Sequence, residues 1–230
     1  MPLCVRNLTV THLADLRPLI KDLTFTLSSP DRLAVIGEEG DGKSTLLKLL
    51  YDPGLIAGYA AFSGAVSAPG ERLGYLPQEL PQKEQEKSVS AFCRACPAFL
   101  NAQGREKAAL IKKLKIRSDM PDEERPVSSL SGGEKVKLQL LLMLLNEPTM
   151  LLMDEPGNDL DIGSLDYLTD FINTCGLPVL YISHDETLLS RTATRVLHLE
   201  QAYKKTEPRW TLKNIPYDAY MRERAAALDK

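Results

Sequence analysis

The sequence predicts an α/β fold in which a mixed β-sheet carries a phosphate-binding loop at the end of one core strand. Residues 33–36 (LAVI) form an apolar run of strand type, and residues 46–50 (LLKLL) open a helix. Between them, residues 37–45 (GEEGDGKST) have the spacing G-x-x-x-x-G-K-S. Farther along the chain, short apolar strands alternate with helical stretches, as expected of parallel strand–helix–strand units.

The loop at residues 37–45 has the residue types that a phosphate group requires. Gly37 and Gly42 let the backbone turn so that its N–H groups point inward, and the start of the next helix adds its positive dipole end. Lys43 can reach the β- and γ-phosphates, and the Ser44 hydroxyl can bind Mg²⁺. An ordinary glycine-rich turn would need neither the strand before it nor the helix after it, so we interpret the loop as a nucleotide site.

The composition is that of one soluble domain, or of one domain with a small inserted subdomain. The chain has 230 residues, of which 43% are hydrophobic and 26% charged, and its net charge of −3 argues against a uniformly basic nucleic-acid-binding surface. No apolar run reaches the roughly 18 residues of a membrane span, and the N-terminus lacks the pattern of a signal peptide. We therefore expect a cytoplasmic protein.

Two of the four cysteines, Cys93 and Cys96, form a C-x-x-C pair. A zinc or redox site would need a second pair or a suitable strand–helix context, which the sequence does not supply here. We therefore expect free thiols.

The first third of the chain is rich in strand-forming residues. Three segments predict a small antiparallel unit that leads into the phosphate loop: residues 3–10, 23–27 and 32–36. After the first helix, short strands are expected at residues 65–67 and 73–76. Pro77 ends the second of these strands, which places Gln78 at its tip.

Residues 81–126 predict a helical subdomain inserted between two halves of the α/β core. Charges are dense in this segment, and helices are expected at residues 89–96 and 103–114. Six basic residues oppose a single acid, Glu106, and we favour a solvated helix face over a partner-binding patch for them: Arg105, Lys107, Lys112, Lys113, Lys115 and Arg117.

The α/β core resumes after this insertion. Ser131 and Glu134 have the spacing of a capping box at the start of a long apolar helix. Buried strands are then expected at residues 150–153 and 179–183, with a helix between them at 162–175, and a further strand at 195–199. The predicted boundaries are a core of residues 1–80 and 127–200, a helical insertion of 81–126, and a C-terminal tail or start of a linker at 201–230 that ends in a helix.

Polar residues follow several of the predicted core strands. Asp154 can hold Mg²⁺, and Glu155 can orient and deprotonate an attacking water. Gln78 can sense the metal or the water, and His184 can contact a γ-phosphate, because catalytic groups collect at the carboxyl ends of core strands. The glycines of residues 130–134 (LSGGE) stand at a second helix start, which is another place for an anion.

Taken in order, these motifs resemble those of the ATP-binding-cassette (ABC) ATPases across nearly the whole chain: GEEGDGKST, YLPQE, LSGGE, LLMDEP, NDLD and YISHD. The LSGG element is the most specific of them. The resemblance implies a P-loop NTPase of ABC type, with an antiparallel β subdomain and an inserted α-helical subdomain around a mixed core sheet. It also implies Mg-ATP as the bound nucleotide and hydrolysis of ATP to ADP and phosphate.

The resemblance implies a role for each motif residue. It makes Gln78 and His184 contributors to catalysis beside Glu155, which would be the catalytic base. The metal would be held by Ser44, Gln78 and Asp154. The remaining ATP-binding positions are the Walker A residues Gly37, Gly40, Asp41, Gly42, Lys43, Ser44 and Thr45, the signature residues Ser131, Gly132 and Gly133, and Asp161 of the D-loop.

The resemblance also implies that two cassettes pack head-to-tail, each signature closing on the nucleotide held by the other. The second cassette lies either elsewhere in a longer chain or in a second copy. Residues 154–162 (DEPGNDLDI) and 183–200 resemble the ABC-F branch, which acts on ribosomes in translation or in antibiotic resistance. The alternative is the nucleotide-binding subunit of a membrane transporter, whose partner would be a permease.

Three features depart from the ABC-F pattern. That family carries two cassettes in one chain, whereas this sequence has one. Gly157 stands where the family usually has Thr. The aromatic residue that stacks on adenine has no clear counterpart, and His12 falls nearest to its position.

Overall fold

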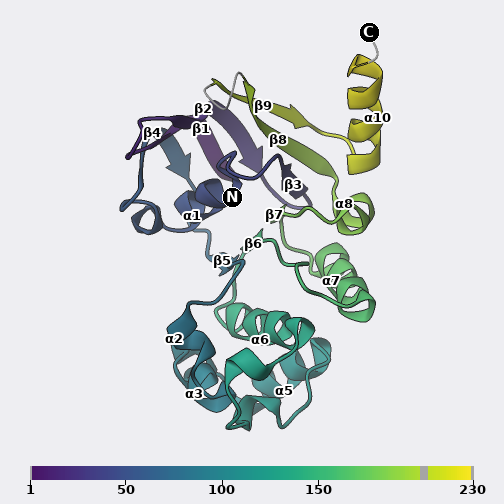
Figure 1. Ribbon diagram of the computed structural model, residues 1–230. Coiled ribbons are helices and arrows are strands. Elements are labelled where there is room, and N and C mark those ends of the chain that lie inside the picture. Colours follow the sequence, from purple (N-terminus) through teal and green to yellow (C-terminus); the bar gives the residue numbers. More distant parts are fainter. Residues whose placement is uncertain (1, 203–206, 229–230) are drawn as a thin grey trace.

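A computed structural model describes residues 2–202 and 207–228 (Figure 1). The first of its two sheets is antiparallel, has the strand order β2-β1-β4, and consists of β1 (Leu3–His12), β2 (Pro18–Leu27) and β4 (Ala60–Ser67). Apolar side chains alternate along β1 and β2 so that one face of this sheet is buried. The strand expected at residues 65–67 is longer than predicted, because pairing with β1 extends it through a segment with few strand-forming residues.

The second sheet contains six strands in the order β5-β6-β7-β3-β8-β9. Its strands are β5 (Leu73–Leu76), β6 (Met150–Asp154), β7 (Val179–Ile182), β3 (Arg32–Ile36), β8 (Arg195–Gln201) and β9 (Glu207–Lys213). The first five are parallel, and only β9 runs antiparallel to its neighbour. Because parallel strands end at one edge of a sheet, the segments that follow β5, β6, β7 and β3 are brought together.

Each face of the six-stranded sheet has its own apolar core. One core lies between the two sheets and includes α1 (Lys43–Tyr51), which packs through Leu46, Leu47 and Leu50. The other core lies on the opposite face, beneath α6 (Gly132–Leu144), α7 (Ile162–Thr174) and α8 (Glu186–Thr192). Successive residues of β6 alternate between the two cores, so this strand is buried on both faces.

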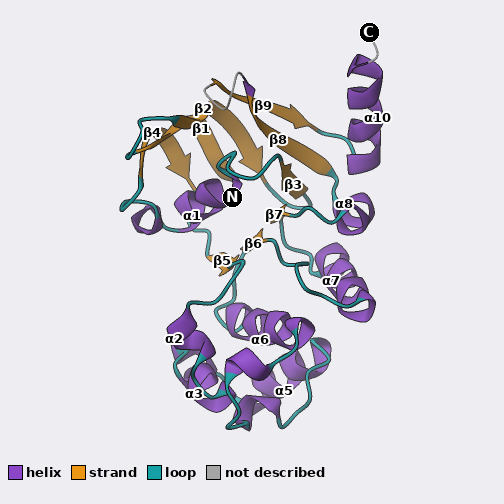
Figure 2. Ribbon diagram, in the orientation of Figure 1, coloured by secondary structure: helices purple, strands orange, loops and turns teal. Residues whose placement is uncertain are grey.

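Most of the remaining helices lie apart from the strands, at the lower end of the view in Figures 1 and 2. They are α2 (Gln82–Gln85), α3 (Val89–Arg94), α4 (Pro97–Asn101) and α5 (Gly104–Lys113), and α6 lies beside them. Short 3₁₀ turns occur at η1 (Pro53–Leu55), η2 (Met120–Asp122) and η3 (Val127–Ser129). The helix expected at residues 89–96 ends earlier than predicted, because Cys96 is extended before Pro97, which opens α4. The predicted domain boundaries stay predictions.

The C-terminal part is more structured than the sequence indicated. Only a helix was expected after residue 202, whereas β9 pairs with residues 196–201 of β8 and α10 (Tyr217–Leu228) packs through two buried tyrosines, Tyr217 and Tyr220. Residues 203–206 and 229–230 of the expected tail lie outside the described residues. Strand β9 escaped prediction because its sequence, EPRWTLK, shows no clear alternation and its side chains are only partly buried. This segment is therefore part of the sheet rather than a linker.

The four cysteines and the basic residues between Arg105 and Arg117 can now be placed in the structure. All four cysteines are free thiols, as expected, and Cys93 is buried. Of the basic residues, Lys107 lies over the ring of Phe99 at 4.7 Å, and Lys115 lies 5.9 Å from the ring centroid of Tyr167. Within residues 2–202 and 207–228, no helix has the length and apolar character needed to cross a membrane.

Candidate nucleotide-binding site

The loop between β3 and α1 has positive φ angles, which favour glycine, at Gly37, Gly40 and Gly42. Gly42 caps α1 in a left-handed conformation with φ of 89°. Gly37 has φ of 150°, and a Cβ added there would lie 2.2 Å from the carbonyl oxygen of Leu199 in β8. The loop is therefore pressed against the neighbouring strand, which fixes its position over the end of the sheet.

Within this loop, Lys43 is buried and turned back over the backbone. Its Nζ donates hydrogen bonds to the carbonyl oxygens of Gly37 (2.8 Å) and Glu38 (2.7 Å). Burial lowers the pKa of Lys43, and the nearby carboxylates, Asp41 first among them, act against that change. Asp41 in turn accepts a hydrogen bond from the Glu38 N–H at 2.7 Å, so it braces the loop from inside.

Ser44 and Asp154 join the phosphate loop to the end of β6. The Ser44 hydroxyl donates to Oδ1 of Asp154 at 3.0 Å, and the Tyr75 hydroxyl lies 3.5 Å from Oδ2. Asp154 is only 1% exposed, and this burial raises its pKa. In the described part of the chain, no group of three or more His, Cys, Asp or Glu side chains is arranged to hold a metal ion. The hydroxyl and carboxylate fit Mg²⁺, with nucleotide phosphates as its further ligands.

Glu155 and His184 form a second pair at the same edge of the sheet. The Nε2 atom of His184 lies 3.2 Å from Oε1 of Glu155, and the His184 N–H donates to Oε2, also at 3.2 Å. Glu155 has a left-handed backbone with φ of 50°, which is unusual for a residue other than glycine. Its buried side chain lies beside the exposed imidazole of His184. Burial raises the pKa of Glu155, which suits a group that must accept a proton.

Most of these groups line one cavity of about 480 Å³, whereas Gly37, Asp41 and Asp154 are not among its lining residues. From the predicted set it contains His12, Gly40, Gly42, Lys43, Ser44, Thr45, Gln78, Glu155 and His184. Gln78, which follows β5, lines the same cavity as Glu155 and His184. Five further residues line the cavity: Arg17, Leu19, Glu39, Tyr59 and Asn158. Glu39 belongs to the phosphate loop and Asn158 to the NDLD motif, whereas only the pairing of β1 with β2 and β4 places Arg17 and Tyr59 there.

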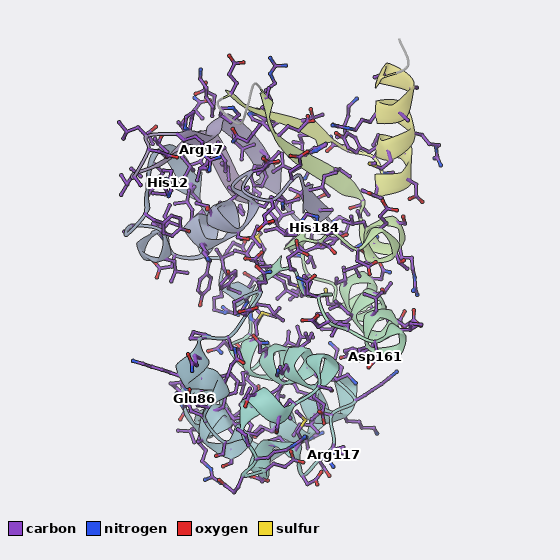
Figure 3. The ribbon with its side chains drawn as sticks, viewed as in Figure 1. His12, Arg17, Glu86, Arg117, Asp161 and His184 are labelled. Atoms are coloured by element: carbon purple, nitrogen blue, oxygen red, sulfur yellow. The ribbon has the colours of Figure 1, made fainter. Side chains whose placement is uncertain are left out.

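The signature residues and Asp161 lie elsewhere. Ser131 caps α6, and its exchange of hydrogen bonds with Glu134 confirms the predicted capping box. Gly132 lines a separate cavity of about 410 Å³, which it shares with Gln78. Asp161 caps α7 by accepting from the Ser164 N–H at 2.8 Å. Figure 3 shows Asp161 well apart from His12, so a role for these residues in nucleotide binding stays a prediction.

His12 lines the cavity, but its ring is already engaged. Its Nδ1 lies 2.9 Å from Oδ1 of Asp15, and the same oxygen accepts from the Arg17 N–H at 3.1 Å. That His12 lies nearest to the base stays a prediction.

Comparison with known proteins agrees with this geometry. Residues 20–158, more than half of the chain, match the protein family described as ABC transporter. The chain belongs to the ABC family, as an ATP-binding cassette. Two solved structures have the same fold: an ATP-binding subunit of an ABC transporter (20% identity, TM-score 0.72, 98% of this chain and 94% of the other) and a putative metal-chelate type ABC transporter (23%, 0.70, 91% and 82%). The predicted fold class is thus confirmed.

Curated relatives of this cassette carry different names. The putative ATP-binding protein YdiF of Bacillus subtilis is 32% identical over 86% of this chain, and the cassette spans 30% of that protein's length. The zinc import ATP-binding protein ZnuC of Yersinia enterocolitica is 33% identical over 80% of this chain and 71% of its own. The energy-dependent translational throttle protein EttA of Haemophilus influenzae is 29% identical, over 80% of this chain and 39% of its own.

We predict that Gly37→Ala weakens nucleotide binding. The new methyl group would collide with the Leu199 carbonyl at a backbone angle that alanine avoids, so the loop must move. We expect at least a tenfold weaker ATP affinity by isothermal titration calorimetry and a loss of about 1–3 kcal/mol in unfolding free energy. Gly58→Ala is the matched control, because nothing lies within 4 Å of its added Cβ. Equal affinities for the two variants would contradict this account of the loop.

We predict that Glu155→Gln stabilises the cassette at high pH. The folded-state pKa of Glu155 lies above its ordinary value of 4.5, so the ionised carboxylate opposes folding. Wild-type stability is therefore favoured below the unfolded-state pKa and falls as the pH rises through the folded-state pKa. In urea unfolding the variant should be more stable than wild type at pH 8 and lose this advantage by pH 4.

The control for that experiment is Glu147→Gln, at a side chain that is 73% exposed. It should show no such difference between the two pH values. A Glu155→Gln variant that is less stable than wild type at pH 8 would show that the ionised carboxylate contributes favourably to folding.

Proposed function

We propose that this cassette binds Mg-ATP and hydrolyses it as one half of a cassette pair. The observation that carries the proposal is the meeting of three sets of groups at one cavity: the phosphate loop with Lys43, the Glu155–His184 pair, and Ser44, whose hydroxyl donates to Asp154. Membership of the ABC family supports ATP as the nucleotide.

The residues have separable tasks in this proposal. Lys43 exchanges its two backbone carbonyl partners for the β- and γ-phosphates. Ser44 and Asp154 would hold Mg²⁺, with Gln78 at the same cavity, and the ion supplies charge neutralisation for the transferred phosphoryl group. Glu155 accepts a proton from the attacking water, and His184 holds the carboxylate in place from the solvent side.

We infer that the complete site needs a second cassette. Ser131, Gly133 and Asp161 do not line the cavity formed by Lys43 and Glu155, although each is a predicted ATP-binding residue. Gly133 packs so tightly on α7 that an added Cβ would lie 2.1 Å from Oγ of Ser164. The start of α6 and the start of α7 therefore form one packed surface, suited to close on a nucleotide held by another cassette.

We predict weak ATP hydrolysis by the isolated chain, rising more steeply than linearly with protein concentration as pairs form. Phosphate release measured across a concentration series checks this. Glu155→Gln should lower the rate by about 10²–10⁴, the range expected for removal of a general base, whereas Glu147→Gln should leave it unchanged. Robust turnover by a demonstrably monomeric sample would contradict the paired site.

For the biological setting, we propose a cytoplasmic ABC-F type protein that acts on the ribosome. The segments DEPGNDLDI and 183–200 support this, as does the similarity to EttA, whose name describes a translational throttle. The cassette spans only 30% and 39% of YdiF and EttA, so the proposal concerns a longer protein of two cassettes.

The second candidate is the nucleotide-binding subunit of a membrane transporter. The similarity to ZnuC favours it, because 71% of that protein's length is covered by a single cassette. A groove of about 550 Å³ between β5 and the helices α3 and α6 would be the place for a permease segment; among its lining residues are Tyr75, Pro77, Leu80, Phe92, Gln139 and Met143.

Ribosome co-sedimentation of the natural full-length protein separates the two candidates. With ATP present, Glu155→Gln should be trapped in the ATP-bound state and pellet with ribosomes severalfold more than wild type. A Glu155→Gln, Lys43→Ala double variant is the control, because it lacks the phosphate contact. If the trapped variant shows no enrichment and instead co-purifies with a membrane protein, the transporter reading replaces the ribosomal one.

A further inference from the structure

The last described helix, α10, packs against α8 and β8, away from the nucleotide cavity (Figure 1). Its two tyrosines are buried where it packs. Two polar contacts also hold it, since Asp218 accepts from the Ser190 hydroxyl of α8 at 2.5 Å and Glu223 pairs with Lys213 of β9 at 3.0 Å. A further set of polar contacts joins α10 to β8 and centres on His198.

His198 of β8 contacts two side chains of α10. Its Nδ1 atom is 2.6 Å from the Tyr220 hydroxyl and 2.9 Å from Nη1 of Arg224, and its ring meets the Tyr220 ring edge-on with centroids 5.8 Å apart. Nη2 of Arg224 also donates to Oε1 of Glu200, two residues farther along β8, at 2.6 Å. The His198 side chain is only 12% exposed, so water has little access to it.

These contacts fix the protonation state of His198. An arginine side chain donates hydrogen bonds and cannot accept them, so Nδ1 must be the acceptor, and it can accept only without a proton. The Tyr220 hydroxyl then also donates to Nδ1, and the imidazole is neutral with its proton on Nε2. A proton added at Nδ1 would turn this acceptor into a donor that faces the permanent positive charge of Arg224.

The surroundings of His198 disfavour a positive imidazole. Burial is the largest influence and lowers the pKa of His198 below its ordinary value of 6.5. Glu200 acts against this change, its Oε1 lying 4.0 Å from Nε2, whereas Arg224 from α10 and Lys43 from the start of α1 reinforce it. The attraction of Glu200 is reduced because this carboxylate already pairs with Arg224.

The other elements next to His198 add little charge. Its strand partners, Ile36 of β3 and Thr211 of β9, are both uncharged. Arg209 of β9 is a further cation near Glu200 and helps to keep that carboxylate ionised. In the described part of the chain, the balance between a neutral and a positive His198 therefore depends mainly on whether α10 covers the ring and brings Arg224 to it.

We propose that His198 is a proton-sensitive contact that holds α10 on β8 while its imidazole is neutral and weakens the docking when Nδ1 takes up a proton from solvent. In the detached state the ring is in water and titrates near pH 6.5, whereas in the docked state it resists the proton. The docking free energy is therefore fully present above about pH 6.5 and falls as the pH drops below that value toward the pKa of the docked state.

This contact lies on the strand that supports the phosphate loop. The residue after His198 is Leu199, whose carbonyl oxygen would be 2.2 Å from a Cβ added to Gly37. The docking of α10 thus bears on β8 directly beside the loop, although the proposal itself requires no bound nucleotide.

The test measures hydrogen–deuterium exchange of the α10 amides at pH 7.5 and pH 5.5, corrected for the intrinsic effect of pH on exchange. In the wild-type chain we expect α10 to exchange severalfold faster at pH 5.5. About tenfold is the limit, because this pH is one unit below the ordinary histidine pKa of about 6.5. The amides of α6 are the internal reference and should keep their protection. An equal loss in both helices would show that the whole cassette loosens, and would overturn the proposal.

Three variants separate the proton from the packing. His198→Asn keeps an acceptor near the place of Nδ1 but does not titrate in this range, so α10 should be equally protected at both pH values. Arg224→Gln removes the charge that opposes the proton, so the difference between the two pH values should shrink. Arg222→Gln is the matched control, because Arg222 is an exposed arginine of the same helix, and it should behave as wild type.

Two results would overturn the proposal: no pH effect on α10 in the wild-type chain, or a pH effect of wild-type size in His198→Asn. If His198→Asn does not fold, an NMR titration of the His198 ring in the wild-type chain decides instead. A pKa below 6.5 that rises in Arg224→Gln supports the proposal, and a pKa at or above 6.5 in the wild-type chain contradicts it.

Discussion

The nucleotide site depends on the close contact between Gly37 and the Leu199 carbonyl. This contact lets the phosphate loop rest directly on β8, so that the loop, Asp154 and Glu155 meet at one edge of the sheet. Leu199 itself is paired with Trp210 of β9, and the Trp210 indole donates to the Lys21 carbonyl in β2 at 3.1 Å. Strand β9, which the sequence did not predict, thus supports Leu199, and the phosphate loop rests on Leu199.

The same edge of the sheet concentrates buried ionisable groups. Burial lowers the pKa of Lys43 and raises those of Asp154 and Glu155, because removal from water disfavours the charged form of each side chain. Each is held by a specific neighbour instead: two loop carbonyls for Lys43, the Ser44 hydroxyl for Asp154 and His184 for Glu155. A bound triphosphate and its metal would give these charges stronger partners, which is why such groups mark functional sites.

The sequence predicted the parts of the fold that are encoded locally. The phosphate loop, the capping box of Ser131 and Glu134, and the apolar strands each depend on residues close together in the chain, and the structure has them where expected. The parts that failed depend on distant partners. Strand β9 has no clear pattern of its own and exists because β8 is beside it. Arg17 and Tyr59 reach the cavity only through the pairing of three strands.

The packing of α6 on α7 bears on how two cassettes would act as one. An added Cβ on Gly132 would lie 2.6 Å from the Asp159 carbonyl, and one on Gly133 would lie 2.1 Å from Oγ of Ser164, whose backbone N–H donates to the capping carboxylate of Asp161. A side chain at either glycine would push the two helix starts apart. Because the starts are packed together, a displacement of one carries the other with it. In the proposed pair, nucleotide contact that displaces Ser131 would therefore also displace Asp161. The segment before Asp161 would carry this displacement to Asn158, which lines the chain's own cavity.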